Sequence, residues 1–463
     1  MKSTDLVRNE EEPQRTRRTQ RKTRVTSVLL CDPLRPLRLT LRRWFRGATR
    51  ALSFAILAAS TSALPGAQET ILIRAARVHP VSSGPIENGE ILVAGGKIAA
   101  VGRSLALPSG ARVIEVPGEV FPGLIEGGAA LGGGADEFRE LTPHLRVAAG
   151  LDRDSRVFER ALQGGVTTAA VTPGGRNVIG GLGVVVKIRP GRRAQQDVRV
   201  DAFLSASLTA ESFAGNMNLR GSAPFTFYHR IPTTRMGTVF LLRRSFFEAL
   251  GLALPAGLEA PEESTLGQFL DPSGKETLAE TLCGARPLRV RARERQEIEA
   301  ALRLASEFRV PVVIEGFGEG ADSIGALSSS RSSVLLSPLD VSIEVPFDST
   351  RPALRDAHRL PALLDAAGIE WAFASGSAAE TPLLRERLGL SLRSGLTAGR
   401  ALRAATLDAA RLLGVSDRTG SIEAGKDADL VAVGGGGPLD LASRVEWVMV
   451  EGELLGQETG ATR

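Results

Sequence analysis

Strand-like apolar runs alternate with helical segments over roughly residues 120–412, and this alternation limits the possible folds more than any other feature of the sequence. The predicted strands cover residues 166–173, 181–190, 287–293, 311–316, 333–338 and 370–375. The predicted helices cover residues 153–165, 235–251, 295–308, 351–368 and 397–414. Such alternation favours a parallel sheet with helical crossovers, and the number and length of the segments favour a closed (β/α)8 barrel of the TIM type.

The stretch from Val120 to Gly134 is predicted to open this barrel. Its apolar residues are interrupted by Pro122 and Gly123 and are followed by small residues, a pattern typical of a buried strand that ends in a loop. The predicted barrel therefore covers residues 120–414.

Short β-branched runs lie on both sides of the predicted barrel. Residues 70–80, 86–102 and 111–126 indicate a small antiparallel sheet, with Asn88-Gly89 and Gly95-Gly96 as tight turns. A partner segment with the same strand–turn–strand pattern follows the barrel at residues 420–455. Residues 69–119 and 415–463 are thus predicted to form two small β-rich parts.

The basic character of the chain is confined to its first 68 residues. The whole chain has a net charge of +5 and a pI near 9.6, values that suggest a nucleic-acid-binding protein. Residues 1–68 contain 14 Lys and Arg against 5 Asp and Glu, a net charge of +9, so the remaining residues carry −4. The sequence therefore argues against a nucleic-acid partner.

Residues 1–68 are predicted to be an export signal. An arginine-rich segment precedes an apolar run at residues 51–59, and small residues follow, where cleavage after Ala63 or Ala67 is plausible. An apolar run of about ten residues is too short to span a bilayer, which argues against an uncleaved anchor. Arg42 and Arg43 leave both the twin-arginine and the general secretory route open, and the predicted location is periplasmic or extracellular, in a bacterial cell.

Several motifs together resemble the amidohydrolase superfamily, and within it the exported imidazolonepropionase-like or prolidase-like members. They include FPGLIE at 121–126, NVIGGLGVVVKIRPG at 177–191, PLRVRARERQEIEAAL at 287–302 and RTGSIEAGKDADLV at 418–431. The resemblance covers nearly all of residues 70–455. It implies a (β/α)8 barrel and a small composite β-sandwich built from both ends of the chain.

The resemblance also implies a divalent metal such as zinc, which activates water to hydrolyse carbon–nitrogen bonds. The first strand of the family carries an HxH pair, and later strands carry two further histidines and an aspartate. In this sequence the corresponding positions are Gly128, Ala130, Arg291, Gly316 and Gly376. The resemblance, with these departures, predicts a degenerate member that holds no metal cofactor.

The histidine count agrees with that prediction. The chain has four histidines, His79, His144, His229 and His358, and no two of them have the spacing of an HxH or HExxH site. Each is expected to be a hydrogen-bonded surface or loop residue.

Arg289, Arg291 and Arg293 alternate along one predicted strand, so their side chains are expected on one face of it. One interpretation is an anion-binding site, because a guanidinium binds carboxylate or phosphate groups bidentately. Lys187 is a further candidate for it, as a relic of the lysine that bridges metals in some members of the superfamily. In the alternative interpretation, Arg291 pairs with Glu315 or Glu294 and only fills space.

Two functional interpretations remain open. In the first, the chain is a non-catalytic protein that accompanies an active relative or binds an acidic small molecule, and it forms a homo- or hetero-oligomer. In the second, it is an active hydrolase of carbon–nitrogen bonds with an atypical site, for which Asp136, Glu137 or Asp152 would be the general base.

Overall fold

The structure is a computed structural model that describes residues 69–132, 139–191, 197–214, 216, 231–255, 270–342 and 357–455. All of them belong to one compact unit, Ser53–Arg463. The predicted export signal lies outside the described residues, as do Asp136, Glu137 and His229. No helix among the described residues is long and apolar enough to cross a membrane.

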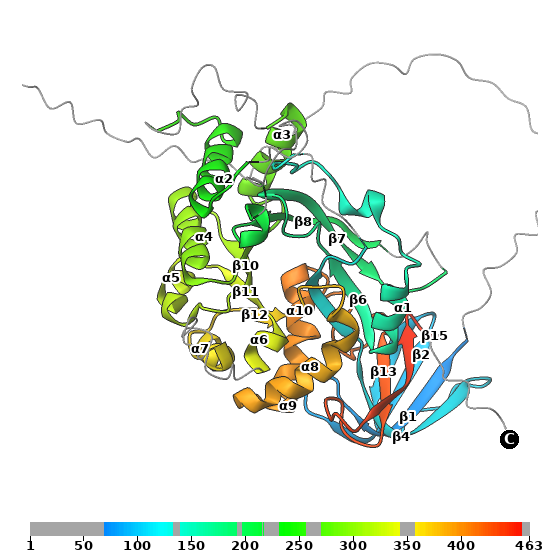
Figure 1. The fold of residues 1–463 in the computed structure, drawn as a ribbon. Helices are drawn as coiled ribbons and strands as arrows, with labels where there is room; N and C mark the ends of the chain where they lie inside the picture. The colour runs from blue at the N-terminus through cyan, green and yellow to red at the C-terminus, as the bar shows by residue number, and fades with distance from the viewer. Residues whose placement is uncertain are drawn as a thin grey trace, which may run out of the picture. The chain divides into compact units, whose positions relative to one another are not determined.

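The larger sheet has eight strands that follow one another in chain order from β5 to β12 (Figure 1). Its strands are β5 Leu124–Ala129, β6 Val166–Val171, β7 Ile179–Lys187, β8 Asp197–Ser207, β9 Leu288–Ala292, β10 Val312–Gly316, β11 Ser333–Leu336 and β12 Trp371–Phe373. The two edges approach each other, because the backbone N–H of Gly376 donates to the carbonyl of Gly128 at 3.0 Å. The sheet is thus nearly closed into a barrel, as predicted, although β8 was not among the predicted strands.

Strand β7 differs from the predicted parallel barrel in its direction. It runs antiparallel to both β6 and β8, whereas the other neighbouring pairs of the sheet are parallel. Only residues 172–178 separate β6 from β7. A parallel crossover needs a dozen or more residues, so this short connection forces a hairpin.

Helices cover the outside of the barrel (Figure 1). They are α1 Arg156–Gln163, α2 Arg235–Ala249, α3 Pro272–Leu282, α4 Arg295–Phe308, α5 Ile324–Ser329, α6 Pro338–Ser342, α7 Leu360–Ala366, α8 Leu384–Ser391, α9 Ala398–Ala404 and α10 Leu407–Leu413. Short 3-10 turns span Val147–Gly150, Ala210–Ser212, Ala321–Ser323, Thr381–Leu383 and Leu392–Ser394. Helix α4 shows why the sequence folds locally, since Glu294 and Glu297 form a capping box at its start and its apolar face is buried.

The helix predicted over residues 397–414 is divided into α9 and α10. Thr406 between them has non-helical backbone angles, and its hydroxyl donates to the carbonyl of Leu402. The carbonyl of Ala405 accepts a hydrogen bond from the backbone N–H of Ile125 on β5, at 2.8 Å. A tertiary contact with the barrel therefore replaces helical hydrogen bonding at this point.

The smaller sheet combines both ends of the described chain, as predicted, in one sheet of seven strands in the order β15-β14-β13-β4-β1-β2-β3. Its strands are β1 Ile71–Val78, β2 Ile86–Ala94, β3 Lys97–Gly102, β4 Arg112–Pro122, β13 Leu430–Gly434, β14 Arg444–Val450 and β15 Glu453–Leu455. The join between the two ends is antiparallel, with Phe121 opposite Val431. The sheet is mixed rather than antiparallel, because β1 and β4 are parallel.

One turn and one strand boundary were wrongly predicted in this sheet. Asn88 and Gly89 lie within β2 instead of forming a turn. Asn88 does have a left-handed φ of 51°, but Gly89 pairs with Ala75 of β1. Strand β4 continues to Pro122, so Val120 and Phe121 belong to the smaller sheet and not to the first barrel strand.

Only Gly123 separates β4 of the smaller sheet from β5 of the barrel. Its N–H donates to the carbonyl of Asp429 at 2.9 Å, and a Cβ at this position would lie 2.1 Å from Oγ1 of Thr167. Only glycine permits such a close approach. This contact fixes the first barrel strand against the smaller sheet and so sets the position of the site at its other end.

Candidate ligand-binding site at the barrel mouth

A pocket of about 260 Å³ lies where the carboxyl ends of the parallel barrel strands meet. Four of the five residues predicted at ligand positions line it, namely Gly128, Arg291, Gly316 and Gly376. The fifth, Ala130, is not among the lining residues. The four come together because the ends of neighbouring parallel strands meet on one face of a barrel.

An ion-pair cluster occupies the floor of the pocket. Arg289 donates from Nη1 to Oε1 of Glu315 at 3.2 Å and to the carbonyl of Gly127 at 2.8 Å. Its guanidinium carbon lies 3.6 Å from the centre of the Phe203 ring. Only 2% of Arg289 is exposed. Burial lowers the pKa of this guanidinium, and the Glu315 carboxylate opposes the shift.

Arg291 is the second arginine of the cluster. Its Nε lies 3.5 Å from Oε2 of Glu315, and its Nη1 donates to Oε2 of Glu211 at 3.3 Å. The interpretation that Arg291 pairs with Glu315 is confirmed. Glu294, the other predicted partner, pairs instead with Arg235 at 2.6 Å.

The predicted common face of the three arginines is confirmed for Arg289 and Arg291, because both contact Glu315 on the neighbouring strand. Arg293 lies just beyond the end of β9, where its Nη2 donates to Asp340 at 2.6 Å. Arg289, Arg291 and Arg293 therefore each have a carboxylate partner.

Gly128 lies directly against the cluster. A Cβ at this position would lie 3.1 Å from Nη1 of Arg289 and 3.1 Å from Oε1 of Glu315. These separations are already below ordinary van der Waals contact, so a side chain as large as imidazole would have to displace the ion pair.

Glu126, the last residue of the FPGLIE motif, is fully buried. Its Oε1 accepts hydrogen bonds from the backbone N–H groups of Gly128 at 2.9 Å and Ser375 at 2.8 Å, and its Oε2 accepts one from Thr381 at 3.2 Å. Burial raises its pKa, against the effect of these hydrogen bonds. The carboxyl group thus joins β5 to the segment after β12 and does not reach the pocket.

The carboxylates that line the pocket each have an arginine partner. Glu211, Glu315, Asp340 and Glu380 are the acidic lining residues, and Glu380 pairs with Arg387 at 2.6 Å. Among the residues that the structure describes, no histidine lines the pocket. Within the described part of the chain, no group of three or more His, Cys, Asp or Glu side chains has an arrangement suited to a metal ion.

The described histidines and Asp152 lie away from this pocket. His79 pairs with Glu119 at 2.6 Å in the smaller sheet, and Nε2 of His144 lies 3.4 Å from Asp271. His358 is half-buried in the 3-10 turn before α7, and Asp152 is exposed. None of the four lines the pocket.

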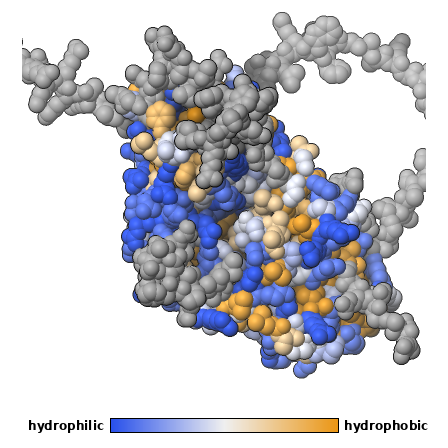
Figure 2. All heavy atoms as spheres, in the orientation of Figure 1, coloured by the Kyte–Doolittle hydropathy of each residue, from blue (hydrophilic) through white to orange (hydrophobic). Residues whose placement is uncertain are grey.

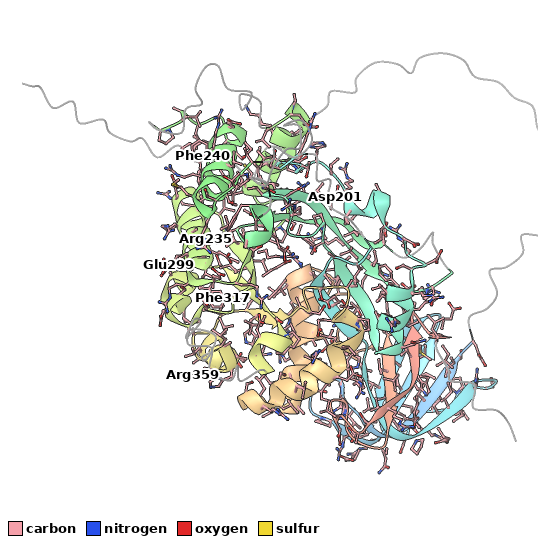
Figure 3. The ribbon with its side chains drawn as sticks, in the orientation of Figure 1. Asp201, Arg235, Phe240, Glu299, Phe317 and Arg359 are labelled. Atoms are coloured by element: carbon pink, nitrogen blue, oxygen red, sulfur yellow. The ribbon has the colours of Figure 1, made fainter. Side chains whose placement is uncertain are left out.

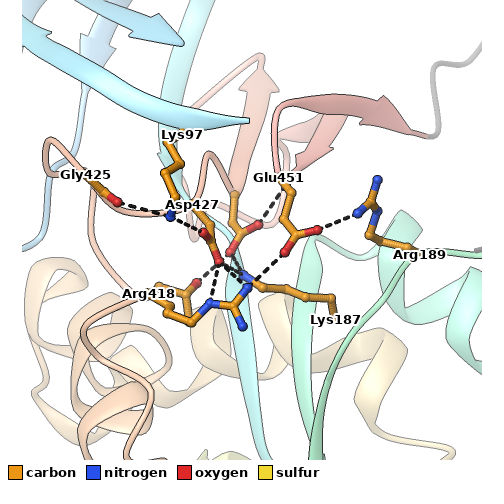
Figure 4. A network of polar contacts seen from close by, with 9 residues as sticks. Lys97, Lys187, Arg189, Arg418, Gly425, Asp427 and Glu451 are labelled. Carbon is orange, nitrogen blue, oxygen red and sulfur yellow. Dashed lines mark hydrogen bonds and ion pairs between the residues drawn. The ribbon is translucent and has the colours of Figure 1, made fainter. Parts of the chain in front are cut away.

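Lys187 was wrongly assigned to the barrel mouth. Because β7 is antiparallel, Lys187 at its end lies opposite Thr168 near the start of β6, at the other end of the barrel. Its ammonium group is buried there with the carboxylates of Asp427, 3.2 Å away, and Asp429 (Figure 4). Arg418 also pairs with Asp427, at 3.0 Å. Asp427 and Asp429 therefore belong to a buried ion network between the two sheets.

Sequence reasoning missed Glu211 and Asp340. Glu211 lies in the 3-10 turn after β8, and the alternating pattern of residues 197–203 was the signal that could have predicted that strand. Asp340 lies in α6, directly after β11, where it is held by Arg293.

Comparison with known proteins agrees with this architecture. The model of the Amidohydrolase family matches residues 329–455. A sequence comparison with curated proteins finds no match. An amidohydrolase from Thermotoga maritima MSB8 is 26% identical, with a TM-score of 0.68 over 84% of this chain and all of that chain.

Two further solved structures share the fold at lower identity. A prolidase complexed with N-methylphosphonate-L-proline is 18% identical, with a TM-score of 0.51 over 84% of this chain and all of that one. Ochratoxinase from A. niger is 16% identical, with a TM-score of 0.50 over 84% of this chain and 96% of that one. The barrel with its composite second sheet, the match of the Amidohydrolase family model to residues 329–455 and the similarity to the Thermotoga protein all support membership of the amidohydrolase superfamily.

Proposed function

We propose that this chain is a non-catalytic member of the superfamily, which binds an acidic small molecule or accompanies an active relative. The observation that carries the proposal is the position of Gly128 against the Arg289–Glu315 ion pair, 3.1 Å from a Cβ to either group. The first ligand strand of the family needs a side chain at this position, and the ion pair occupies the space that it would take.

The donor set at the barrel mouth does not fit a divalent cation. Each carboxylate that lines the pocket is paired with an arginine, and Gly316 and Gly376 offer no side chain. An arginine cannot lose its proton in a protein, so Arg291 repels a cation at a ligand position. These features support a barrel mouth that holds no metal.

Arg291 is the residue of the pocket best placed to bind an acidic ligand. Its partner Glu211 is 61% exposed, so an incoming carboxylate or phosphate can replace Glu211 without leaving a buried charge unpaired. Arg289 is not available for this role because it is buried beneath Glu315, and Lys187 lies at the opposite end of the barrel.

Metal analysis of the mature protein tests the proposal. After dialysis against zinc and manganese, we expect well below one metal equivalent per chain, and no hydrolysis of acyl-amino acids or dipeptides. Close to one equivalent would overturn the proposal. Hydrolysis that persists in chelator would instead support the second interpretation, an active hydrolase with an atypical site.

Arg291→Ala tests the ligand-binding part of the proposal. We expect at least a tenfold loss of affinity for whichever acidic metabolites bind the wild type, because the replacement removes the guanidinium whose partner Glu211 is exposed and can be exchanged. Arg393→Ala is the control, since Arg393 is exposed and is not among the residues that line the pocket. Unchanged binding in Arg291→Ala would show that Arg291 does not bind an acidic ligand, and this part of the proposal would be wrong.

Export and partnership remain part of the same proposal. The predicted signal supports a periplasmic or extracellular location, and purification of the tagged mature chain tests the partnership. Co-purification of an active relative carrying an intact HxH pair would support the partner role, and a homo-oligomer would support self-association.

A further inference from the structure

A groove of about 810 Å³ lies between α4 and α5 on the outside of the barrel. The two helices follow the neighbouring strands β9 and β10 and lie side by side in Figure 1. None of the residues that line this groove lines the pocket at the barrel mouth. Figure 2 shows a hydrophilic face over α4, and Glu299 marks that outer face in Figure 3. The groove is thus separate from the barrel-mouth pocket.

Two arginines in the left-handed backbone conformation line this groove. Arg309, the C-cap of α4, has a φ of 56°, and Arg331, just after α5, has a φ of 55°. Glycine is the usual residue in this conformation after a helix, because a Cβ is disfavoured there. An arginine thus takes a position that favours glycine at the ends of two adjacent helices, and both arginines line one groove.

These two guanidinium groups are uncompensated, unlike the other charges around them. Arg309 and Arg331 are exposed, and their side chains form no ion pair or hydrogen bond within the described ranges. The acidic residues of the groove are already engaged, since Glu299 lies 3.6 Å from Arg303 and Asp322 pairs with Arg295 at 2.6 Å. The groove therefore presents two fixed positive charges to solvent.

The remaining lining suits an oxyanion between these charges. Ser306 is exposed and its side chain has no hydrogen bond within the described part of the chain, so its hydroxyl is free to donate. Leu302 and Ala305 of α4 give the groove an apolar floor, on which a ligand is partly shielded from water. Guanidinium forks bind phosphate and carboxylate in bidentate fashion.

We infer that this groove binds a small polyanion with two or more phosphate or carboxylate groups, of which Arg309 and Arg331 each take one. The competing explanation is that each arginine only neutralises the negative end of its own helix. If the groove binds a polyanion, its affinity for that polyanion must fall when both guanidinium groups are removed and the backbone is unchanged. The competing explanation predicts no such loss.

Isothermal titration of the full chain with pyrophosphate and with citrate tests the inference, using the double variant Arg309→Gly/Arg331→Gly. Glycine suits both backbone positions, so the variant is expected to fold and to retain the wild-type melting temperature or exceed it. We expect the wild type to bind at least one of the two probes, more tightly than inorganic phosphate, and the double variant to lose tenfold or more in affinity.

Arg444→Ala is the matched control, because Arg444 is exposed and lies on β14, outside the groove. Binding of pyrophosphate alone would identify a phosphate ligand, and binding of citrate alone a polycarboxylate. The inference would be overturned if neither probe bound, if the double variant bound as well as the wild type, or if Arg444→Ala weakened binding equally. Because Arg291 is unchanged in all these proteins, the result is independent of the barrel-mouth proposal.

Discussion

The guanidinium of Arg289 donates to the carboxylate of Glu315 at 3.2 Å, inside the barrel and directly beside Gly128. The pair joins β9 to β10 at the level where strand ends of this fold face the pocket. Since Arg289 is 2% exposed and Glu315 7%, neither charge is compensated by water. The pair therefore decides both the stability of the barrel mouth and what else can enter it.

Removal of one member of this pair is expected to be costly. Glu315→Ala leaves the buried Arg289 without its carboxylate, and we expect the free energy of unfolding in urea to fall by roughly 3–5 kcal/mol. The double variant Arg289→Met/Glu315→Leu, which removes both charges, is expected to be close to neutral. Equal losses in the single and double variants would show that packing, rather than the unpaired charge, controls stability here.

Restoration of a histidine at position 128 is not expected to restore a metal site. Gly128→His forces an imidazole against the ion pair, so we expect the free energy of unfolding to fall by about 1–3 kcal/mol. We also expect no gain of zinc in elemental analysis. Ala130→His, at a position outside the pocket lining, is the comparison and is expected to cost less. Stoichiometric zinc in Gly128→His would contradict our account of the cluster.

Glu126 is expected to make stability fall as the pH rises. Burial raises its pKa above the ordinary value of a glutamate, so the folded protein holds this proton at pH values where the unfolded chain has released it. Its contribution is fully present below about pH 4.3 and is lost as the pH rises through the raised pKa. Glu126→Gln removes this titration and keeps the size of the side chain.

The measurement for this prediction is urea unfolding of wild type and Glu126→Gln between pH 4 and pH 8. As the pH increases, we expect the free energy of unfolding of Glu126→Gln to rise relative to that of the wild type. Glu299→Gln serves as the control at an exposed position of α4. A difference that stays constant with pH would mean that Glu126 has no raised pKa in the folded protein.

Lys187 is expected to be structural and to have no part in ligand binding. Lys187→Met leaves the buried Asp429 without its ammonium partner, while Asp427 keeps Lys97 and Arg418, and we expect a loss of roughly 3–5 kcal/mol in the free energy of unfolding. Lys97 also pairs with Asp427, at 2.9 Å, but is 55% exposed, so Lys97→Met is expected to cost about 0–1 kcal/mol.

A second measurement separates this structural role from a role at the site. Any acidic ligand that binds at Arg291 should bind Lys187→Met with unchanged affinity under conditions where the variant is folded. A loss of ligand affinity with unchanged stability would show that Lys187 takes part in ligand binding.

The sequence by itself determined most of the elements of this protein and four of the residues at its barrel mouth. Hydrophobic periodicity and length defined most of the strands and helices, and α4 begins and ends at the predicted residues, Arg295 and Phe308. Their positions at predicted strand ends also indicated that four residues lie together, and all four line one pocket: Gly128, Arg291, Gly316 and Gly376. These features are local, or result from the rule that parallel strands end on one face of a barrel.

Only the tertiary structure decided strand direction, charge pairing and the space available to each side chain. The antiparallel course of β7 moved Lys187 to the other end of the barrel, and a hydrogen bond from Ile125 divided the helix predicted over residues 397–414. The partners of Arg291 and the closed space beside Gly128 depend on side chains from β9, β10 and the turn after β8, which are distant in sequence. Periodicity describes which face a side chain takes, but charge pairing and steric exclusion arise only when separate strands come together.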